Sequence, residues 1–145
     1  MEGVEKVVVD ASVAVKWFVP ERHYERAVAL RDAYLRGEVE LAAPDLVLYE
    51  VANALRFHRV FRLAPGDVVG AVRALAGLGI VRSLSPEEWL RAIELSVDGG
   101  VSVYDAVYGA MALSIGGMLV TSDEELYEKI GGKVRVVMLS ELSLH

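Results

Sequence analysis

The sequence contains no cysteine. This absence excludes a disulfide framework, a thiolate metal site and a cysteine nucleophile. Histidine is scarce as well, and His23, His58 and His145 lack the spacing of paired metal ligands. No Ser/His/Asp triad, glycine-rich phosphate loop or GxGxxG motif is visible. The sequence therefore gives no sign of nucleophilic side-chain catalysis or of nucleotide binding through those motifs.

Basic residues are outnumbered. The chain has 15 Lys and Arg against 21 Asp and Glu, a formal net charge of −6 and a pI near 5.1. Because surfaces that coat nucleic acid are usually basic, this balance counts against non-specific phosphate binding. It does not exclude a nuclease, because divalent cations can neutralise clustered carboxylates.

Long apolar runs are also missing. No segment approaches the roughly 18 apolar residues that span a bilayer, and Asp10 and Lys16 interrupt the first apolar run. The first residues are acidic, unlike those of a secretory signal. We expect a cytoplasmic protein without membrane contact, in keeping with the absence of cysteine.

What is present is the pattern of one α/β domain over residues 1–145, of which 54% are hydrophobic. Short apolar strands separated by helices predict a three-layer α/β/α sandwich around a mostly parallel sheet. The expected strands cover residues 7–9, 40–43, 80–84, 118–121 and 134–139. The expected helices are a short one after Asp10 and then 23–36, 46–61, 68–78, 85–98, 102–115 and 122–130.

The clearest helix start is Ser85, which is followed by proline and, three residues later, by Glu88. Serine as the N-cap with glutamate three residues on is a capping box, and proline suits the first helical position. Trp89, Ile93 and Val97 then recur every four residues. This spacing predicts that the three side chains form the helix's core-facing side.

Four acids are candidates for a shared site. Asp10 ends the first strand, and Asp123 follows the strand 118–121 by two residues. The carboxyl ends of parallel strands meet at one edge of a sheet, so these two acids are expected close together. Asp105 lies in the first turn of its helix, and helix starts often follow the same edge. Glu50 lies in an otherwise apolar helix, where a carboxylate needs a partner.

Each aspartate also has a structural interpretation, which the residues alone leave open. Asp10 could cap the helix that follows it. Asp105 lies three residues after a serine, in a capping-box pattern with aspartate in place of glutamate. Asp123 suits the first turn of a helix, and Ser122 with Glu125 forms another capping box beside it.

If the four acids do meet, their chemistry follows from charge. Carboxylates in one pocket repel one another and raise each other's pKa. Mg²⁺ or Mn²⁺ relieves that repulsion, because hard cations prefer oxygen ligands. Two such ions, roughly 4 Å apart, can activate a water and stabilise the leaving oxygen of a phosphodiester.

Four motifs resemble those of the PIN-domain nucleases, most closely the VapC toxins of VapBC toxin–antitoxin pairs. They cover essentially the whole chain in order: VVVDAS with VKWF (7–18), LYEVANAL (48–55), VYDAVYGAMA (103–112) and LVTSDEEL (119–126). The resemblance implies a Mg²⁺- or Mn²⁺-dependent endoribonuclease that acts on single-stranded or looped RNA. It makes Asp10, Glu50, Asp105 and Asp123 the acidic metal-site residues.

The resemblance also implies roles. Asp10 and Asp105 would be the main ligands, Glu50 would hold or orient a water at the metal, and Asp123 would complete the site, directly or through water. The polar positions that support such sites correspond to Ser12, Asn53 and Thr121. The family resemblance further implies a homodimer and inhibition by a VapB-like antitoxin.

Arg56, Arg59 and Arg62 surround His58 and form the sequence's one local basic cluster. The cluster could bind RNA phosphate or an antitoxin carboxylate, or be a solvated helix end. Phe57 and Phe61 beside it could pack in a dimer interface or in the core, and we expect the core.

Three residues near Asp105 carry further expectations. We expect Tyr104 to point away from the site, Tyr108 to border it, and Gly109 to allow close packing against the sheet or another helix.

Three alternatives to a toxin stay open. A PIN nuclease of RNA processing would lack an antitoxin, so the gene upstream would distinguish it. A non-catalytic PIN-like binding module would tolerate loss of the acids, all four of which are intact. A flavodoxin-like ligand or receiver domain would need a phosphate loop or a receiver-type lysine, and neither is evident.

Overall fold

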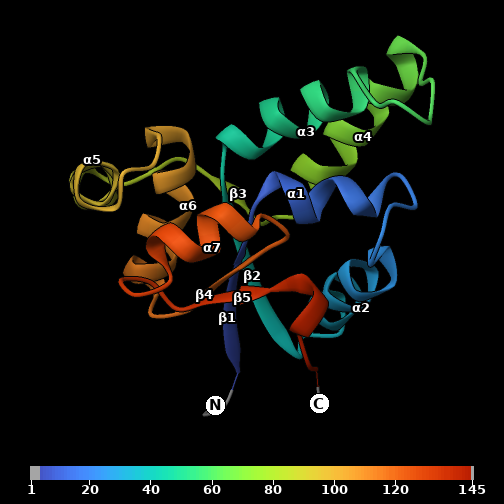
Figure 1. The fold of residues 1–145 in the computed structure, drawn as a ribbon. Helices are drawn as coiled ribbons and strands as arrows, with labels where there is room; N and C mark the ends of the chain where they lie inside the picture. The colour runs from blue at the N-terminus through green and yellow to red at the C-terminus, as the bar shows by residue number, and fades with distance from the viewer. Residues whose placement is uncertain (1–3, 145) are drawn as a thin grey trace.

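The computed structural model describes residues 4–144, in which five strands form one parallel sheet of order β3-β2-β1-β4-β5 (Figure 1). The strands are β1 (Glu5–Val9), β2 (Val39–Pro44), β3 (Val81–Arg82), β4 (Met118–Thr121) and β5 (Val136–Met138). The helices are α1 (Ala11–Ala14), α2 (Tyr24–Leu35), α3 (Leu46–Arg56), α4 (Pro65–Gly77), α5 (Pro86–Gly99), α6 (Val103–Ile115) and α7 (Glu124–Ile130). Short 3₁₀ turns follow α1 (Val15–Trp17) and β5 (Leu139–Glu141).

The helices form layers on both sides of the sheet. Figure 1 shows α5, α6 and α7 on one side and α2 on the other, with α3 and α4 as a hairpin beyond the carboxyl ends of the strands. Helix α6 contacts β1, β2 and β4, whereas α2 contacts β2. The predicted α/β sandwich is confirmed, and every strand pair in the described sheet is parallel.

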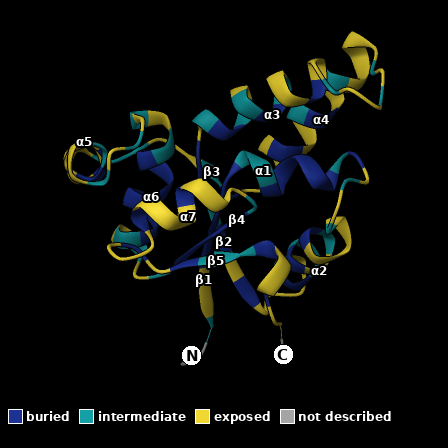
Figure 2. Ribbon diagram, in the orientation of Figure 1, coloured by how far each residue is buried: buried dark blue, intermediate teal, exposed yellow. Residues whose placement is uncertain are grey.

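Strands β1 and β4, which pair with each other, are deeply buried over most of their length (Figure 2). Val7, Val8 and Val9 have no exposed surface, and all of β4 is buried. Because helices cover both faces, these strands are continuously apolar rather than alternating. Val9 pairs with Val120, so the residues that follow them, Asp10 and Thr121, come out of the sheet together.

Helix α3 ends at Arg56, whereas the sequence predicted a helix to about residue 61. The His58 ring explains the early end, because its Nδ1 accepts the backbone N–H groups of Val60 and Phe61 at 3.3 and 3.2 Å. These bonds fold the chain into a loop. The prediction that Phe57 packs in the core is wrong, because its side chain is 64% exposed.

The predicted core-facing side of α5 is also wrong. Trp89, Ile93 and Val97 are exposed, and the helix instead buries Glu88, Ala92 and Leu95. The capping box at Ser85 is confirmed. Helix α5 packs on α6 at Gly109, where an added Cβ would lie 2.7 Å from a Leu95 methyl carbon. The predicted close packing at this glycine is therefore confirmed, and α5 meets it through Leu95.

None of the helices within residues 4–144 is long and apolar enough to cross a membrane. The cytoplasmic location expected from the sequence stays a prediction.

Candidate active site

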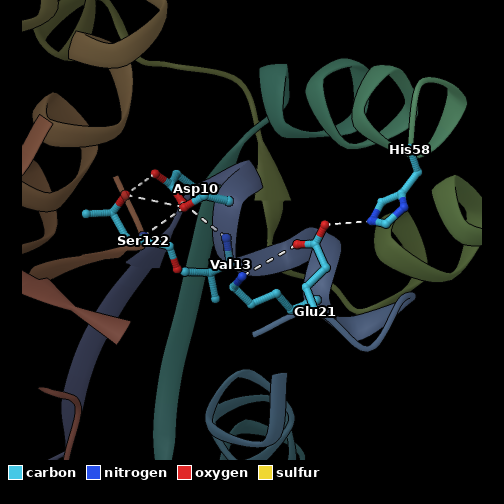
Figure 3. Close-up of polar contacts among 8 residues, drawn as sticks. Asp10, Val13, Glu21, His58 and Ser122 are labelled. Atoms are coloured by element: carbon cyan, nitrogen blue, oxygen red, sulfur yellow. Dashed lines mark hydrogen bonds and ion pairs between the residues drawn. The ribbon is translucent and has the colours of Figure 1, made fainter. Parts of the chain in front are cut away.

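Asp10 lies at the carboxyl end of β1 and is only 6% exposed. Ser12 Oγ donates to its Oδ1 at 2.6 Å, and Thr121 Oγ1 donates to its Oδ2 at 2.5 Å. The Val13 backbone N–H also donates to Oδ1 at 3.3 Å, so Asp10 caps α1 as one interpretation of the sequence allowed. Donors from α1, Ser12 and Val13, and from the end of β4, Thr121, thus hold the carboxylate (Figure 3).

The hydroxyls that hold Asp10 are themselves oriented by the backbone after β4. The Ser122 N–H donates to Ser12 Oγ at 2.8 Å, and the Asp123 N–H donates to Thr121 Oγ1 at 3.0 Å. Each hydroxyl therefore accepts from the backbone and donates to Asp10. Ser12 and Thr121 therefore hold the Asp10 carboxylate in place, and their supporting role in a reaction stays a prediction.

Asp123 caps α7, since its Oδ1 accepts the Leu126 N–H at 3.1 Å. The capping box predicted for Ser122 and Glu125 is wrong, because the cap lies one residue later. Ser122 Oγ is instead buried, with no hydrogen-bond partner among the described residues. Asp123 leaves its second carboxylate oxygen free of the cap.

Burial raises the pKa of Asp10 to about 6. The Ser12 and Thr121 hydroxyls and the Val13 N–H oppose this rise, and the charge of Asp123 adds to it. A carboxylate desolvated to this extent is costly at neutral pH unless a cation compensates it.

Glu50 lies half-buried on α3, and the Tyr108 hydroxyl of α6 donates to its Oε1. Burial raises the pKa of Glu50, the bond from Tyr108 lowers it and the charge of Asp105 raises it. The expectation that Tyr108 borders the acids is confirmed. Burial and the Glu50 carboxylate raise the pKa of the Tyr108 phenol far above its ordinary value, so it acts only as a donor here.

Asp105 lies in the first turn of α6, where Ser102 Oγ accepts its backbone N–H at 3.1 Å. Burial raises the pKa of Asp105, and the charge of Asp123 raises it further. Glu125 acts in the same direction and Lys129 opposes them. Lys129 is a nearby cation that was not predicted from the sequence. It lies four residues beyond Glu125 on α7, and the two side chains form an ion pair at 2.8 Å.

These electrostatic links join all four predicted acids. The charge of Asp123 acts on both Asp10 and Asp105, and the charge of Asp105 acts on Glu50. The acids come from β1, α3, α6 and the start of α7. Asn53, the remaining supporting candidate, is exposed one turn beyond Glu50 and lines the same open groove.

Within the described chain, no three Asp, Glu or His side chains are placed closely enough to hold a metal ion as they stand. Hydroxyl donors satisfy two of the acids instead: Ser12 and Thr121 bind Asp10, and Tyr108 binds Glu50. The donor set nevertheless suits a hard divalent cation, because it consists of carboxylate oxygens. Burial and the charge of a neighbouring acid raise the pKa of three of these carboxyl groups, those of Asp10, Glu50 and Asp105.

Comparison with known proteins decides the family. Residues 7–132 match the PIN domain family model. The chain belongs to the PIN-domain family. Its fold and the order of its four acidic motifs agree with this membership, as the sequence resemblance predicted.

Two curated relatives come from Pyrobaculum aerophilum. One, named Ribonuclease VapC3, is 38% identical over 127 residues, which is 86% of this chain and 94% of the relative. The other, named Exonuclease VapC9, is 33% identical over 109 residues, 74% of this chain and 80% of the relative.

Solved structures share the fold. PAE2754 from Pyrobaculum aerophilum superposes with a TM-score of 0.67 at 26% identity, covering 95% of this PIN-domain chain and 93% of the other. A DNA-bound VapBC from Salmonella typhimurium gives 0.68 at 17% identity, covering 94% and 99%. This second likeness shows the fold alone.

The basic cluster is not one unit. His58 turns inward: its Nε2 lies 2.7 Å from Glu21 Oε2, and Lys16 reaches the other Glu21 oxygen at 3.5 Å (Figure 3). Because His58 Nδ1 accepts backbone N–H groups, Nε2 carries the proton given to Glu21. Arg56 and Arg59 remain exposed. Histidine's inward role could not be predicted, since Glu21 lies 37 residues away.

Proposed function

We propose that this PIN-domain protein is a Mg²⁺- or Mn²⁺-dependent endoribonuclease that hydrolyses single-stranded or looped RNA. The observation that carries the proposal is the electrostatically linked set of four acids at the carboxyl end of the sheet. The relative named Ribonuclease VapC3, which aligns with most of the chain, supports RNA as the substrate.

Asp10 and Asp105 would hold the metal, with Asp123 beside them and Glu50 across the site. A bound divalent cation would lower the pKa of a water and stabilise charge on the phosphate. Ser12 and Thr121 keep Asp10 oriented and ionised, because both donate to it. Tyr108 fixes the Glu50 carboxylate, which can then accept a proton from the attacking water.

The test is cleavage of end-labelled single-stranded RNA with Mg²⁺, Mn²⁺ or EDTA. We expect metal-dependent internal cuts that Asp10→Asn and Asp105→Asn each abolish while circular dichroism stays native. Asp98→Asn, an exposed change on α5, is the matched control and should cleave normally. Equal cleavage in EDTA, or full activity of both site variants, would overturn the proposal.

The same assay separates endonuclease from exonuclease, which the relative named Exonuclease VapC9 makes a specific second candidate. A circular RNA has no ends. Its linearisation supports internal cutting, and its resistance beside rapid loss of the linear form supports an exonuclease.

We further propose that the protein is the toxin of a toxin–antitoxin pair, homodimeric and inhibited by a VapB-like partner. The VapC names of both relatives support this assignment. An open reading frame for a small protein directly upstream, whose product co-purifies and blocks cleavage, is the expected result. If the neighbouring gene encodes no inhibitor, a nuclease of RNA processing is favoured. A monomeric mass by light scattering at micromolar concentration would refute the dimer.

A further inference from the structure

An open groove of about 400 Å³ adjoins the proposed site, lined by Leu46, Tyr49, Glu50, Asn53, Ala54 and Tyr104. Tyr49 of α3 is 75% exposed and Tyr104 of α6 is 65% exposed. Glu50 belongs both to this groove and to the acidic set. The groove therefore carries two solvent-facing aromatic rings beside a proposed catalytic carboxylate, and the expectation that Tyr104 points away from the site is wrong.

The exposed side of α3 continues away from the groove. Asn53 and Arg56 are exposed, and they follow Tyr49 by four and seven residues. Steps of four and three residues place these three side chains on one face of the helix. Phe57, the residue directly after α3, is exposed as well. The Arg56 guanidinium lies over the Phe57 ring, 4.5 Å from its centroid. From Tyr49 to Arg56 the helix rises about 10 Å.

The far end of this face is basic in a chain whose net charge is −6. Arg59 and Arg62 are exposed in the loop that follows α3, and the hydrogen bond of His58 with Glu21 helps to fix that loop. Arginine carries its charge at any physiological pH and binds phosphate through paired N–H donors.

We infer that Tyr49, Asn53 and Arg56 of α3, Phe57 directly after it and Tyr104 of α6 form a single-stranded RNA track that leads into the site. Unpaired bases stack on Tyr49 and Tyr104, and Arg56 binds the phosphate further along. Alternating aromatic and basic groups are how proteins bind single strands without reading sequence. The inference rests on the proposed function and deepens it, because stacking on exposed rings selects unpaired over paired RNA.

A protein interface is the competing use of these rings. Tyrosine, phenylalanine and arginine are enriched in protein interfaces, but glutamate is depleted at their centres, and Glu50 lies within the groove. Because Glu50 belongs both to the groove and to the proposed site, a strand bound on the two rings would lead to the reacting centre, which favours RNA over a second protein.

The experiment measures binding separately from cleavage. Fluorescein-labelled single-stranded oligoadenosine is titrated into the Asp10→Asn protein with Mg²⁺, and anisotropy gives the Kd. Adding Tyr49→Ala or Tyr104→Ala should each weaken binding about 5-fold to 100-fold, the range for losing one stacked base. Tyr49→Phe and Tyr104→Phe keep the ring and should restore affinity. Arg56→Ala should weaken binding and reduce its logarithmic salt dependence by about 0.7.

Trp89→Ala removes an exposed aromatic from α5 and is the matched control, expected to bind like its parent. The parent protein should prefer the single strand to the same strand in a duplex. Unchanged affinity in both tyrosine-to-alanine variants would overturn the track, and so would a Tyr49→Ala protein whose mass falls by light scattering while its RNA affinity stays constant. RNA cleavage by the unsubstituted protein tests the proposed function on its own, so either idea can fail alone.

Discussion

The Tyr108 hydroxyl of α6 donates a hydrogen bond to the Glu50 carboxylate of α3. The two residues are 58 positions apart, and their bond links two helices that reach the site from different parts of the fold. Tyr108 is almost fully buried and cannot easily turn away, so Glu50 has one preferred orientation. Proton transfer from water requires such a fixed acceptor.

Tyr108→Phe should therefore slow RNA hydrolysis without removing a metal ligand. A hydrogen bond to a charged group contributes roughly 1.5–3 kcal/mol, which corresponds to a fall in kcat of about 10-fold to 100-fold if it orients Glu50 in the transition state. The measurement is kcat at saturating Mn²⁺. Tyr24→Phe, a partly exposed tyrosine on α2, is the control. An unchanged kcat would show that the bond has no part in the reaction.

Gly109→Ala should destabilise the protein. A Cβ there would lie 2.7 Å from Leu95 Cδ2, 3.1 Å from Ile130 Cδ1 and 3.3 Å from Val134 Cγ2. Alanine is the better helix former by about 1 kcal/mol, but forcing a methyl group among three buried side chains costs about 1–3 kcal/mol. We expect urea unfolding to give a lower free energy of unfolding for Gly109→Ala than for the unsubstituted protein.

Gly70→Ala in α4 provides the opposite case, since nothing lies within 4 Å of its added Cβ. Its helix propensity acts alone, so this variant should gain about 0.5–1 kcal/mol. If the two substitutions changed stability in the same direction, crowding at Gly109 would not be the cause.

The parallel strand pattern was enough to predict that Asp10 and Asp123 meet. Apolar runs without alternation indicated a covered parallel sheet, and that sheet brings both strand ends to one edge. The Tyr108–Glu50 bond depends on how α6 and α3 pack, which local spacing does not encode. The family resemblance, and not the capping patterns, singled out Ser12 and Thr121, which donate hydrogen bonds to Asp10; their supporting role in a reaction stays a prediction.

Helix α5 shows why apolar periodicity failed where it looked strongest. Trp89 is exposed while Glu88, its acidic neighbour, is buried. The reason lies in other elements: Arg82, near β3's end, neutralises Glu88 through two bonds of 2.7 and 2.8 Å. Gly109 lets α6 approach Leu95 closely, so the side of α5 that carries Leu95 is the buried one. Arg82 and Gly109 both lie outside α5, so the spacing of apolar residues within α5 could not show which of its sides is buried.

Glu88→Gln should destabilise the fold at neutral pH by roughly 2 kcal/mol, a figure reduced because the Arg82 side chain is 43% exposed. The Arg82 guanidinium lowers the pKa of Glu88 from 4.5 to about 2. A lowered pKa means that the ionised form stabilises the fold above pH 4.5 and that this stability is lost as the pH falls from about 4.5 towards 2.

Urea unfolding across that pH range measures the effect. The difference in free energy of unfolding between Glu88→Gln and the unsubstituted protein should shrink as the solution becomes acidic. Glu87→Gln, the exposed neighbour, should change stability by less than about 0.5 kcal/mol. A constant difference across the range would show that Glu88 acts through packing and not through its charge.

Asp10→Asn should stabilise the metal-free protein at neutral pH. Burial raises the pKa of Asp10 from 3.8 to about 6, so the ionised form costs roughly 3 kcal/mol above pH 6, and that cost disappears as the pH falls towards 3.8. Asparagine carries no charge to bury, although it loses the charge-assisted bonds from Ser12 and Thr121. In EDTA at pH 7 we expect the free energy of unfolding of Asp10→Asn, measured with urea, to exceed that of the unsubstituted protein by about 1–2 kcal/mol. This difference should be smaller at pH 4.

With millimolar Mn²⁺ the unsubstituted protein should become more stable than Asp10→Asn. An ion that binds the folded state raises its stability by mass action, by about 2.7 kcal/mol at 100 times the Kd. Asp10 would be a principal ligand, so the unsubstituted protein should gain Tm with Mn²⁺ while Asp10→Asn gains little. Asp98→Asn controls for general charge removal and should respond like the unsubstituted protein. An equal rise in all three proteins would place the bound metal away from Asp10. A carboxylate that weakens the metal-free fold and strengthens the metal-loaded one is what selection for catalysis, rather than for stability, would retain.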